Sequence, residues 1–240
     1  IFPTYFENEV VRYRSLGNSF VRPLAFKRKV LPLFLEGPVH ALKVEKDPER
    51  RRALLKAVRE SALFDSKLGM YKVNAPLTDT SLEVGRSRVF TPGWLENESI
   101  WLHMEYKYML EVLRKGLYKE FFSDLKNCLV AFQDPARYGR SILENSSFIA
   151  SSAYPDKSIR GNGFVARLTG STTEFLSIWL LMCLGKEPFR VSRGKLYFEL
   201  KPILPRWLFT AKDTFIFCLL GKTLVVYHNP KRLDTFGDRA

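Results

Sequence analysis

The feature that most constrains the fold is a polar turn that leads directly into an apolar segment. Residues 175–184 read Phe-Leu-Ser-Ile-Trp-Leu-Leu-Met-Cys-Leu, and Gly185 follows them. Thr172 or Thr173 suits the N-cap of a helix, and Gly185 suits a left-handed C-cap. The pattern therefore predicts a helix that begins near these threonines, ends before the glycine and packs in a core.

The turn before that helix, Thr169-Gly170-Ser171, has two interpretations. The first N–H groups of a helix lack carbonyl partners and carry the positive end of its dipole. Hydroxyl groups placed there, beside a glycine that lets a ligand approach the backbone, would form a phosphate site. The alternative is a capped core helix after a polar turn, with no ligand, and spacing alone favours this alternative.

The charge of the chain favours anionic partners. Its 240 residues carry a formal net charge of +13, and 46% of them are hydrophobic, enough for a globular core. The cations are scattered, however, and the densest runs, 27–29 and 50–52, are only three residues long. Asp47 and Pro48 predict a helix start just before the second run, which then lies on a solvated helix face. We therefore expect no nucleic-acid partner and no membrane partner.

The cysteines and the apolar segments indicate the compartment. Cys128, Cys183 and Cys218 lie far apart among apolar neighbours and lack the spacing of metal ligands. They predict reduced core thiols, no metal site and a cytoplasmic protein. The longest apolar run, residues 175–184, is too short to span a bilayer.

The order of the patterns along the chain predicts a mainly α fold with a β appendage. Residues 1–40 have a strand-and-loop character, with 31–38 as an extended buried lining. Residues 69–97 and 134–164 are rich in glycine, proline and small polar residues and are expected to be loops. Helices are predicted from Asp47 to about 63, over 99–115 and over 118–130, and strands over 195–200, 214–219 and 223–228.

One histidine is a candidate for the same chemistry as the polar turn. His103 is the single histidine that we expect inside the molecule, on the helix over 99–115. An imidazole beside helix N–H groups and hydroxyls would form an oxyanion or phosphate site. The alternative is a core histidine with satisfied hydrogen bonds, which is the commoner case.

Two short motifs resemble a known family. Residues 92–103 read Pro-Gly-Trp-Leu-Glu-Asn-Glu-Ser-Ile-Trp-Leu-His. This resembles the Pro-Gly…Glu-Asn-Gly-Gly-Ile-Phe…His segment of the inverting glycoside phosphorylases, which act on cellobiose, chitobiose or β-glucans. Leu168-Thr169-Gly170-Ser171 is similar to their later Thr-Gly-Ser/Thr signature, and the order of elements over roughly 85–230 is theirs. One departure is that Glu98 and Ser99 stand where the family has Gly-Gly.

The resemblance implies a fold and a set of domains. Residues 1–188 would be the C-terminal portion of an (α/α)6 catalytic barrel, and residues 189–240 would begin a small antiparallel C-terminal β-domain. The protein would be a homodimer.

The resemblance also implies a reaction. Inorganic phosphate, the co-substrate, attacks the anomeric carbon of a β-linked glucoside or oligoglucan with inversion, and a carboxylic acid protonates the leaving oxygen. The product is a sugar 1-phosphate, and no cofactor is needed. The residues implied to bind phosphate are His103, Thr169, Gly170 and Ser171, and those near the sugar are Glu96 and Asn97.

The general acid of that family is expected outside this chain. Its aspartate lies well upstream of the histidine motif, beyond what precedes His103 here, and Glu96, Glu144 and Asp156 are only loop carboxylates. We therefore expect a piece of a longer protein that contains no catalytic residue and is inactive alone. Two other interpretations are a glycoside hydrolase on the same barrel and a non-catalytic basic module that binds polyanions.

Overall fold

Helices and strands contribute comparably to the computed structural model. The structure describes residues 3–166 and 169–237, and for Ala166 and Thr169 it describes the backbone only. Helices take up 35% of the chain and strands 25%, the latter in five small antiparallel sheets. The prediction of a mainly α fold from an (α/α)6 barrel is therefore wrong. Several segments whose composition is typical of loops pair as strands, and their sequences show no helical periodicity.

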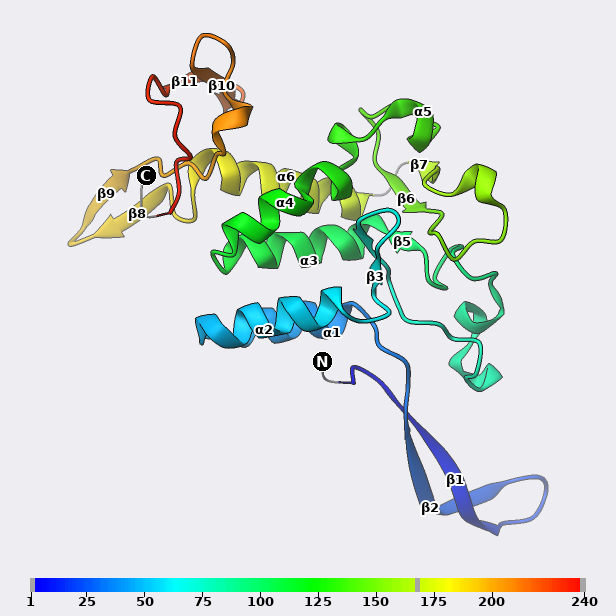
Figure 1. Ribbon diagram of the computed structural model, residues 1–240. Helices are drawn as coiled ribbons and strands as arrows, with labels where there is room; N and C mark the ends of the chain where they lie inside the picture. The colour runs from blue at the N-terminus through cyan, green and yellow to red at the C-terminus, as the bar shows by residue number, and fades with distance from the viewer. Residues whose placement is uncertain (1–2, 167–168, 238–240) are drawn as a thin grey trace.

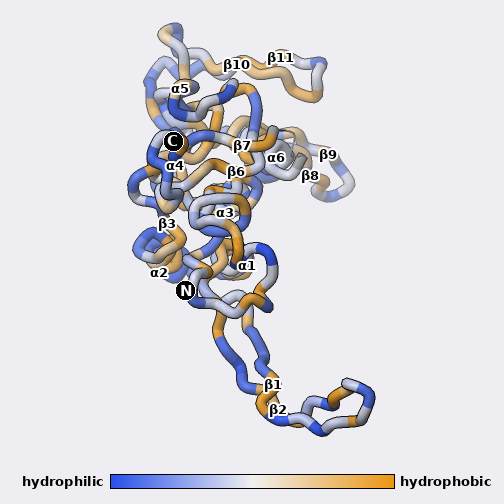
Figure 2. The backbone as a smooth tube through the Cα atoms, turned by 90° about the vertical axis from the view of Figure 1, so that its right-hand side faces the viewer, coloured by the Kyte–Doolittle hydropathy of each residue, from blue (hydrophilic) through white to orange (hydrophobic). Residues whose placement is uncertain are grey.

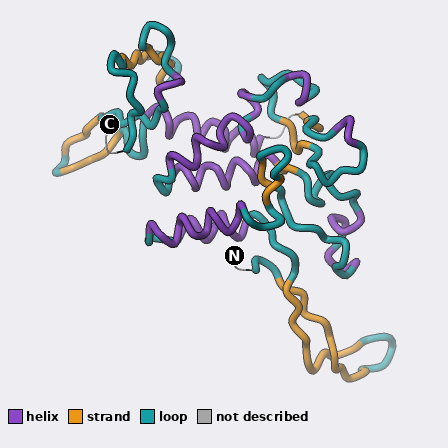
Figure 3. The backbone as a smooth tube through the Cα atoms, viewed as in Figure 1, coloured by secondary structure: helices purple, strands orange, loops and turns teal. Residues whose placement is uncertain are grey.

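The helices form the body of the molecule, and most of the strands lie around it (Figures 1 and 3). Helix α3 is central, because it packs against α1, α4 and α6. Its Leu102, Met109 and Leu113 are fully buried. The helices are α1 (Glu36–Val44), α2 (Pro48–Arg59), α3 (Leu102–Arg114), α4 (Tyr118–Cys128), the short α5 (Pro135–Tyr138) and α6 (Thr169–Leu184).

Most strands form hairpins, and a single sheet has three strands among the described residues. The hairpins are β1 (Phe6–Ser15) with β2 (Val21–Val30), β3 (Phe64–Asp65) with β4 (Met70–Tyr71), β8 (Phe189–Ser192) with β9 (Lys195–Phe198), and β10 (Thr214–Leu219) with β11 (Thr223–His228). The three-stranded sheet has the order β5 (Ile100–Trp101), β6 (Ser146–Ile149) and β7 (Gly163–Ala166).

Several predicted elements are present. Asp47 caps α2, accepting hydrogen bonds from Glu49 N at 2.8 Å and Arg50 N at 3.4 Å, with Pro48 as the first helical residue. Arg50 is exposed on the face opposite Leu55, as expected for a solvated helix face. Helices α3 and α4 lie within the predicted ranges, and β10 and β11 have the predicted bounds.

Other elements differ from the prediction. Helix α1 begins at Glu36, inside the segment predicted to be extended, because Pro38 lies in its first turn, where a missing N–H costs no helical bond. Strands β6 and β7 lie where loops were predicted. Cys128 and Cys183 are buried as predicted, but Cys218 is exposed on β10, which among the described residues pairs with β11 alone. Among the described residues, no helix has the length and apolar character to cross a membrane.

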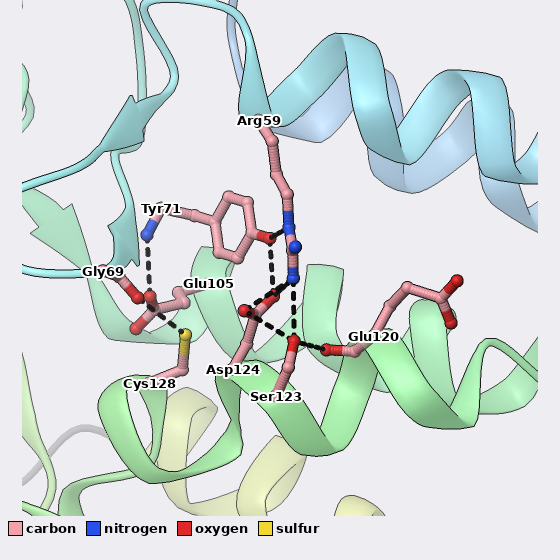
Figure 4. Close-up of polar contacts among 8 residues, drawn as sticks. All are labelled: Arg59, Gly69, Tyr71, Glu105, Glu120, Ser123, Asp124 and Cys128. Carbon is pink, nitrogen blue, oxygen red and sulfur yellow. Dashed lines mark hydrogen bonds and ion pairs between the residues drawn. The ribbon is translucent and has the colours of Figure 1, made fainter.

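A buried polar cluster joins α2, β4, α3 and α4 (Figure 4). Arg59 Nη2, from the end of α2, lies 2.6 Å from both carboxylate oxygens of Asp124 on α4. The hydroxyl of Tyr71 donates to Asp124 Oδ2 at 2.7 Å, and Tyr71 N donates to Glu105 Oε1 on α3 at 2.8 Å. These bonds hold the ends of three helices and a strand together around charged groups.

Candidate anion-binding site

Helices α3 and α6 begin at the same end of the molecule and run side by side (Figure 1). Strand β5 leads directly into α3, and β7 precedes α6 in the same sheet, with β6 between the two strands. The sheet therefore brings two helix N-termini together. Each N-terminus carries partial positive charge, so an anion is favoured there.

Helix α6 begins earlier than predicted, before the expected N-cap at Thr172 or Thr173. The helix starts at Thr169, so Gly170 and Ser171 lie inside its first turn and Thr172 does not cap it. Ser171 is fully buried, and Thr172 is exposed. The side chain of Thr169 lies outside the described part of the chain, as do Arg167 and Leu168.

The imidazole of His103, in the first turn of α3, packs directly on Gly170. A Cβ atom added to Gly170 would lie 2.6 Å from His103 Nδ1 and 2.9 Å from both Cε1 and Cγ. A side chain at position 170 would therefore displace the ring. The imidazole is still 35% exposed, so a ligand in solvent can reach it. We call His103 and the first turn of α6 the His103–Gly170 site.

Burial, together with a neighbouring cation, lowers the pKa of His103 in the free protein. Burial lowers the pKa of His103 below its usual value, and the charge of Lys107, one turn further along α3, lowers it further. Glu174 opposes both effects, with its Oε1 3.7 Å from His103 Nε2. A phosphate bound here would add negative charge and raise that pKa, so binding should be coupled to protonation of the imidazole.

A loop residue links the site to its surroundings. Asn145 Nδ2 donates to Thr172 Oγ1 at 3.5 Å, and the hydroxyl of Tyr106 donates to Asn145 Oδ1 at 3.0 Å. Asn145 thus joins α3 to the first turns of α6. Sequence reasoning missed Lys107 and Glu174 as members of this site. For Lys107 the signal was present, because it lies four residues after His103 on the same helix face.

The two residues expected near the sugar, Glu96 and Asn97, bind neighbouring protein groups instead. Asn97 is buried, and its Nδ2 donates to Phe90 O at 2.7 Å. Glu96 Oε1 pairs with Arg86 Nη2 at 2.6 Å, and Glu96 O accepts a hydrogen bond from Asn74 Nδ2. These contacts shape the loop before β5, and a sugar-binding role for Glu96 and Asn97 stays a prediction.

The structure explains how Glu98 occupies a position where the resembling family has glycine. Its φ of 58° lies in the left-handed region, which glycine adopts most easily. Here the strain is offset by buried contacts, because Glu98 N donates to Asn74 Oδ1 and Lys72 Nζ lies 2.8 Å from Glu98 Oε2. Both charged side chains are nearly buried, at 12% and 8% exposure. This ion pair was not predicted from the sequence.

Across residues 3–166 and 169–237, no group of three or more histidine, cysteine, aspartate or glutamate side chains is arranged to hold a metal ion. The groups around His103 are the N–H groups of the first turn of α6 and the cation of Lys107, which suit an oxyanion, and one carboxylate, that of Glu174.

No protein-family model matches the chain, and no curated protein matches it at a significant level. The resemblance to the phosphorylases therefore depends on the two motifs and on the order of elements along the chain.

Proposed function

We propose that the His103–Gly170 site binds inorganic phosphate and that the chain supplies the phosphate-binding half of a glycoside phosphorylase, a hexosyltransferase. The observation that supports this is the packing of the His103 ring on Gly170 at the start of α6. It unites the two motifs that resemble the phosphorylases, although they are far apart in the sequence.

The chemistry follows from what these groups can donate. N–H groups of the first turn of α6 and the imidazole of His103 orient the phosphate. One phosphate oxygen bonds to the anomeric carbon of a β-linked glucoside or oligoglucan while the glycosidic C–O bond breaks, with inversion. The leaving oxygen takes its proton from a carboxylic acid. We place this reaction in the cytoplasm.

Replacing His103 by alanine should weaken phosphate binding about tenfold to a hundredfold, because a hydrogen bond to a charged group is lost. Titration of the chain with inorganic phosphate, followed calorimetrically, measures this. The matched control is His40→Ala, because His40 is an exposed histidine on α1, 3.6 Å from Glu36. Equal affinities for H103A and H40A, or no phosphate binding by the unaltered chain, would contradict the proposal.

Replacing Gly170 by alanine should lower phosphate affinity without lowering stability. The new Cβ would lie 2.6 Å from His103 Nδ1 and push the ring out of place, whereas alanine is a better helix former than glycine. The control is Gly185→Ala at the other end of α6. There φ is 85° and a Cβ would lie 2.5 Å from Lys201 O, so Tm should fall while phosphate affinity is kept. The opposite pattern would show that Gly170 serves packing only.

The same titrations separate the two other interpretations. A hydrolase would use water, so its activity would not depend on phosphate. A polyanion-binding module would bind through scattered surface cations, so its affinity would fall steeply with salt and survive His103→Ala.

A further inference from the structure

The β1–β2 hairpin projects from the body of the molecule as an arm. It stands clear of the helices in two views turned by 90° (Figures 1 and 2). Its contacts with the body lie at its base, where the Tyr5 hydroxyl donates to Glu36 Oε2 at 2.7 Å and Thr4 Oγ1 donates to Phe34 O at 3.2 Å. An isolated two-stranded hairpin is only marginally stable in water, so a partner that covers part of it would stabilise it.

The tip of the arm, residues 15–21, is uncharged, carries two large apolar side chains and has a defined shape. It contains no charged residue, and Leu16 and Phe20 are 61% and 71% exposed. The turn is closed by hydrogen bonds from Leu16 N to Phe20 O and from Phe20 N to Gly17 O, both of 2.9 Å. Two large apolar side chains are therefore held in water at the end of the arm, far from the core.

Directly behind the tip, two arginines face each other across the hairpin. Arg14 and Arg22 are paired in the register of β1 and β2, and both are exposed. Among the described residues, neither has a carboxylate within ion-pairing distance. Like charges on opposite strands destabilise a hairpin, and an anion between them would remove that cost. By contrast, Lys29 near the base pairs with Glu9 at 2.7 Å.

We propose that the tip of this arm docks on the surface of an anionic lipid membrane. Leu16 and Phe20 enter the boundary between headgroups and acyl chains, while Arg14 and Arg22 bind the lipid phosphates. The scattered cations of the sequence gave no reason to expect a membrane partner, but folding brings these two arginines together beside an apolar tip.

Two other partners for the tip, a second copy of the chain and a nucleic acid, fit its side chains less well. Pairing of two tips from two copies of the chain would gather the arginines of both and increase their repulsion. A nucleic acid would satisfy Arg14 and Arg22 but would leave the exposed leucine and phenylalanine side chains beside phosphates and water. An anionic membrane satisfies both the charged and the apolar part of the tip.

Co-sedimentation with vesicles tests the proposal. The chain should bind vesicles of phosphatidylcholine mixed with phosphatidylglycerol about thirtyfold more tightly than vesicles of phosphatidylcholine alone, the effect of two cations at the surface. The double variants Leu16→Ser/Phe20→Ser and Arg14→Glu/Arg22→Glu should each lose at least about tenfold in binding. The matched controls, Leu143→Ser (92% exposed) and Arg50→Glu/Arg52→Glu on α2, should keep it.

A fluorescence measurement gives a second readout that does not depend on the double variants. Phe20→Trp should show a blue shift on vesicles that contain phosphatidylglycerol, and brominated lipids should quench the new tryptophan. Binding without dependence on phosphatidylglycerol, or equal loss in the controls, would overturn the proposal. So would binding to duplex DNA in place of vesicles, or a dimer in solution that Leu16→Ser/Phe20→Ser abolishes.

Discussion

Replacing Asp124 by asparagine is expected to lower the free energy of unfolding by about 2–3 kcal/mol, because a partly buried ion pair with charged hydrogen bonds loses its anion. The side chain of Asp124 is 11% exposed, and both of its oxygens lie 2.6 Å from Arg59 Nη2. Burial disfavours the charge of Arg59, but the hydrogen bonds to Asp124 and Tyr71 more than offset this and raise the pKa of the guanidinium. Without the carboxylate, that cation remains partly buried with no anionic partner.

Urea unfolding of the Asp124→Asn variant measures the change. A surface pair on the same side of the molecule provides the control, because Lys56 and Glu60 are 3.7 Å apart and mostly exposed. Glu60→Gln should cost less than about 1 kcal/mol. If the two variants lose the same stability, the cluster in Figure 4 does not hold the helix ends together in the way described.

The parts of the fold that were predictable have strong local signals. Asp47 and Pro48 fix the start of α2 with a side-chain cap and a preset φ, and neither depends on distant residues. Likewise, the alternating residues of β10 and β11 are joined by a tight turn in which Gly221 has a φ of 68°. In both cases the residues that determine the element lie within it.

The parts that were missed depend on distant partners. Strands β6 and β7 are four residues each, too short for an alternating pattern, and β6 pairs with β5 far upstream. Among the described residues, however, most of the strand content lies in local hairpins, above all β1 with β2, where the sequence predicted only a mixed strand-and-loop character. Glu98 shows the same limit, because its left-handed backbone depends on Lys72 and Asn74 from an earlier loop.

The candidate site was predictable only in part. The motifs pointed to His103 and Gly170, and their contact requires the sheet that places β5 and β7 on either side of β6. Nothing local to either motif indicates that sheet. Glu174, which lies in the second turn of α6 and contacts the imidazole, follows from the observed start of the helix at Thr169 rather than from the predicted one.

Glu105 should make stability fall as the pH rises, and Glu105→Gln should remove that fall. Glu105 is fully buried, and among the described residues its Oε2 has no hydrogen-bond partner. Burial raises the pKa of Glu105 to about 8 from an ordinary value of 4.5, although the hydrogen bond from Tyr71 N opposes the shift. At neutral pH the folded protein therefore keeps this carboxyl protonated, while the unfolded chain has released the proton.

The sign follows from proton binding. Below about pH 4.5 both states are protonated and Glu105 causes no loss of stability. Between about 4.5 and 8 the folded state binds more protons, so each unit of rising pH costs about 1.4 kcal/mol, or about 5 kcal/mol over the whole interval. Above about pH 8 both states have lost the proton, and this contribution no longer changes.

Glutamine has the shape of the protonated acid and keeps an acceptor for Tyr71 N, but it cannot ionise. Glu105→Gln should therefore match the unaltered chain within about 1 kcal/mol near pH 5 and exceed its stability by several kcal/mol near pH 9. Urea unfolding across this range measures both. The control, Glu111→Gln, removes a buried carboxylate of the same helix that pairs with Arg114 at 2.8 Å, so it should lose stability instead. A Glu105→Gln variant whose stability declines with pH as steeply as that of the unaltered chain would mean that another group is responsible.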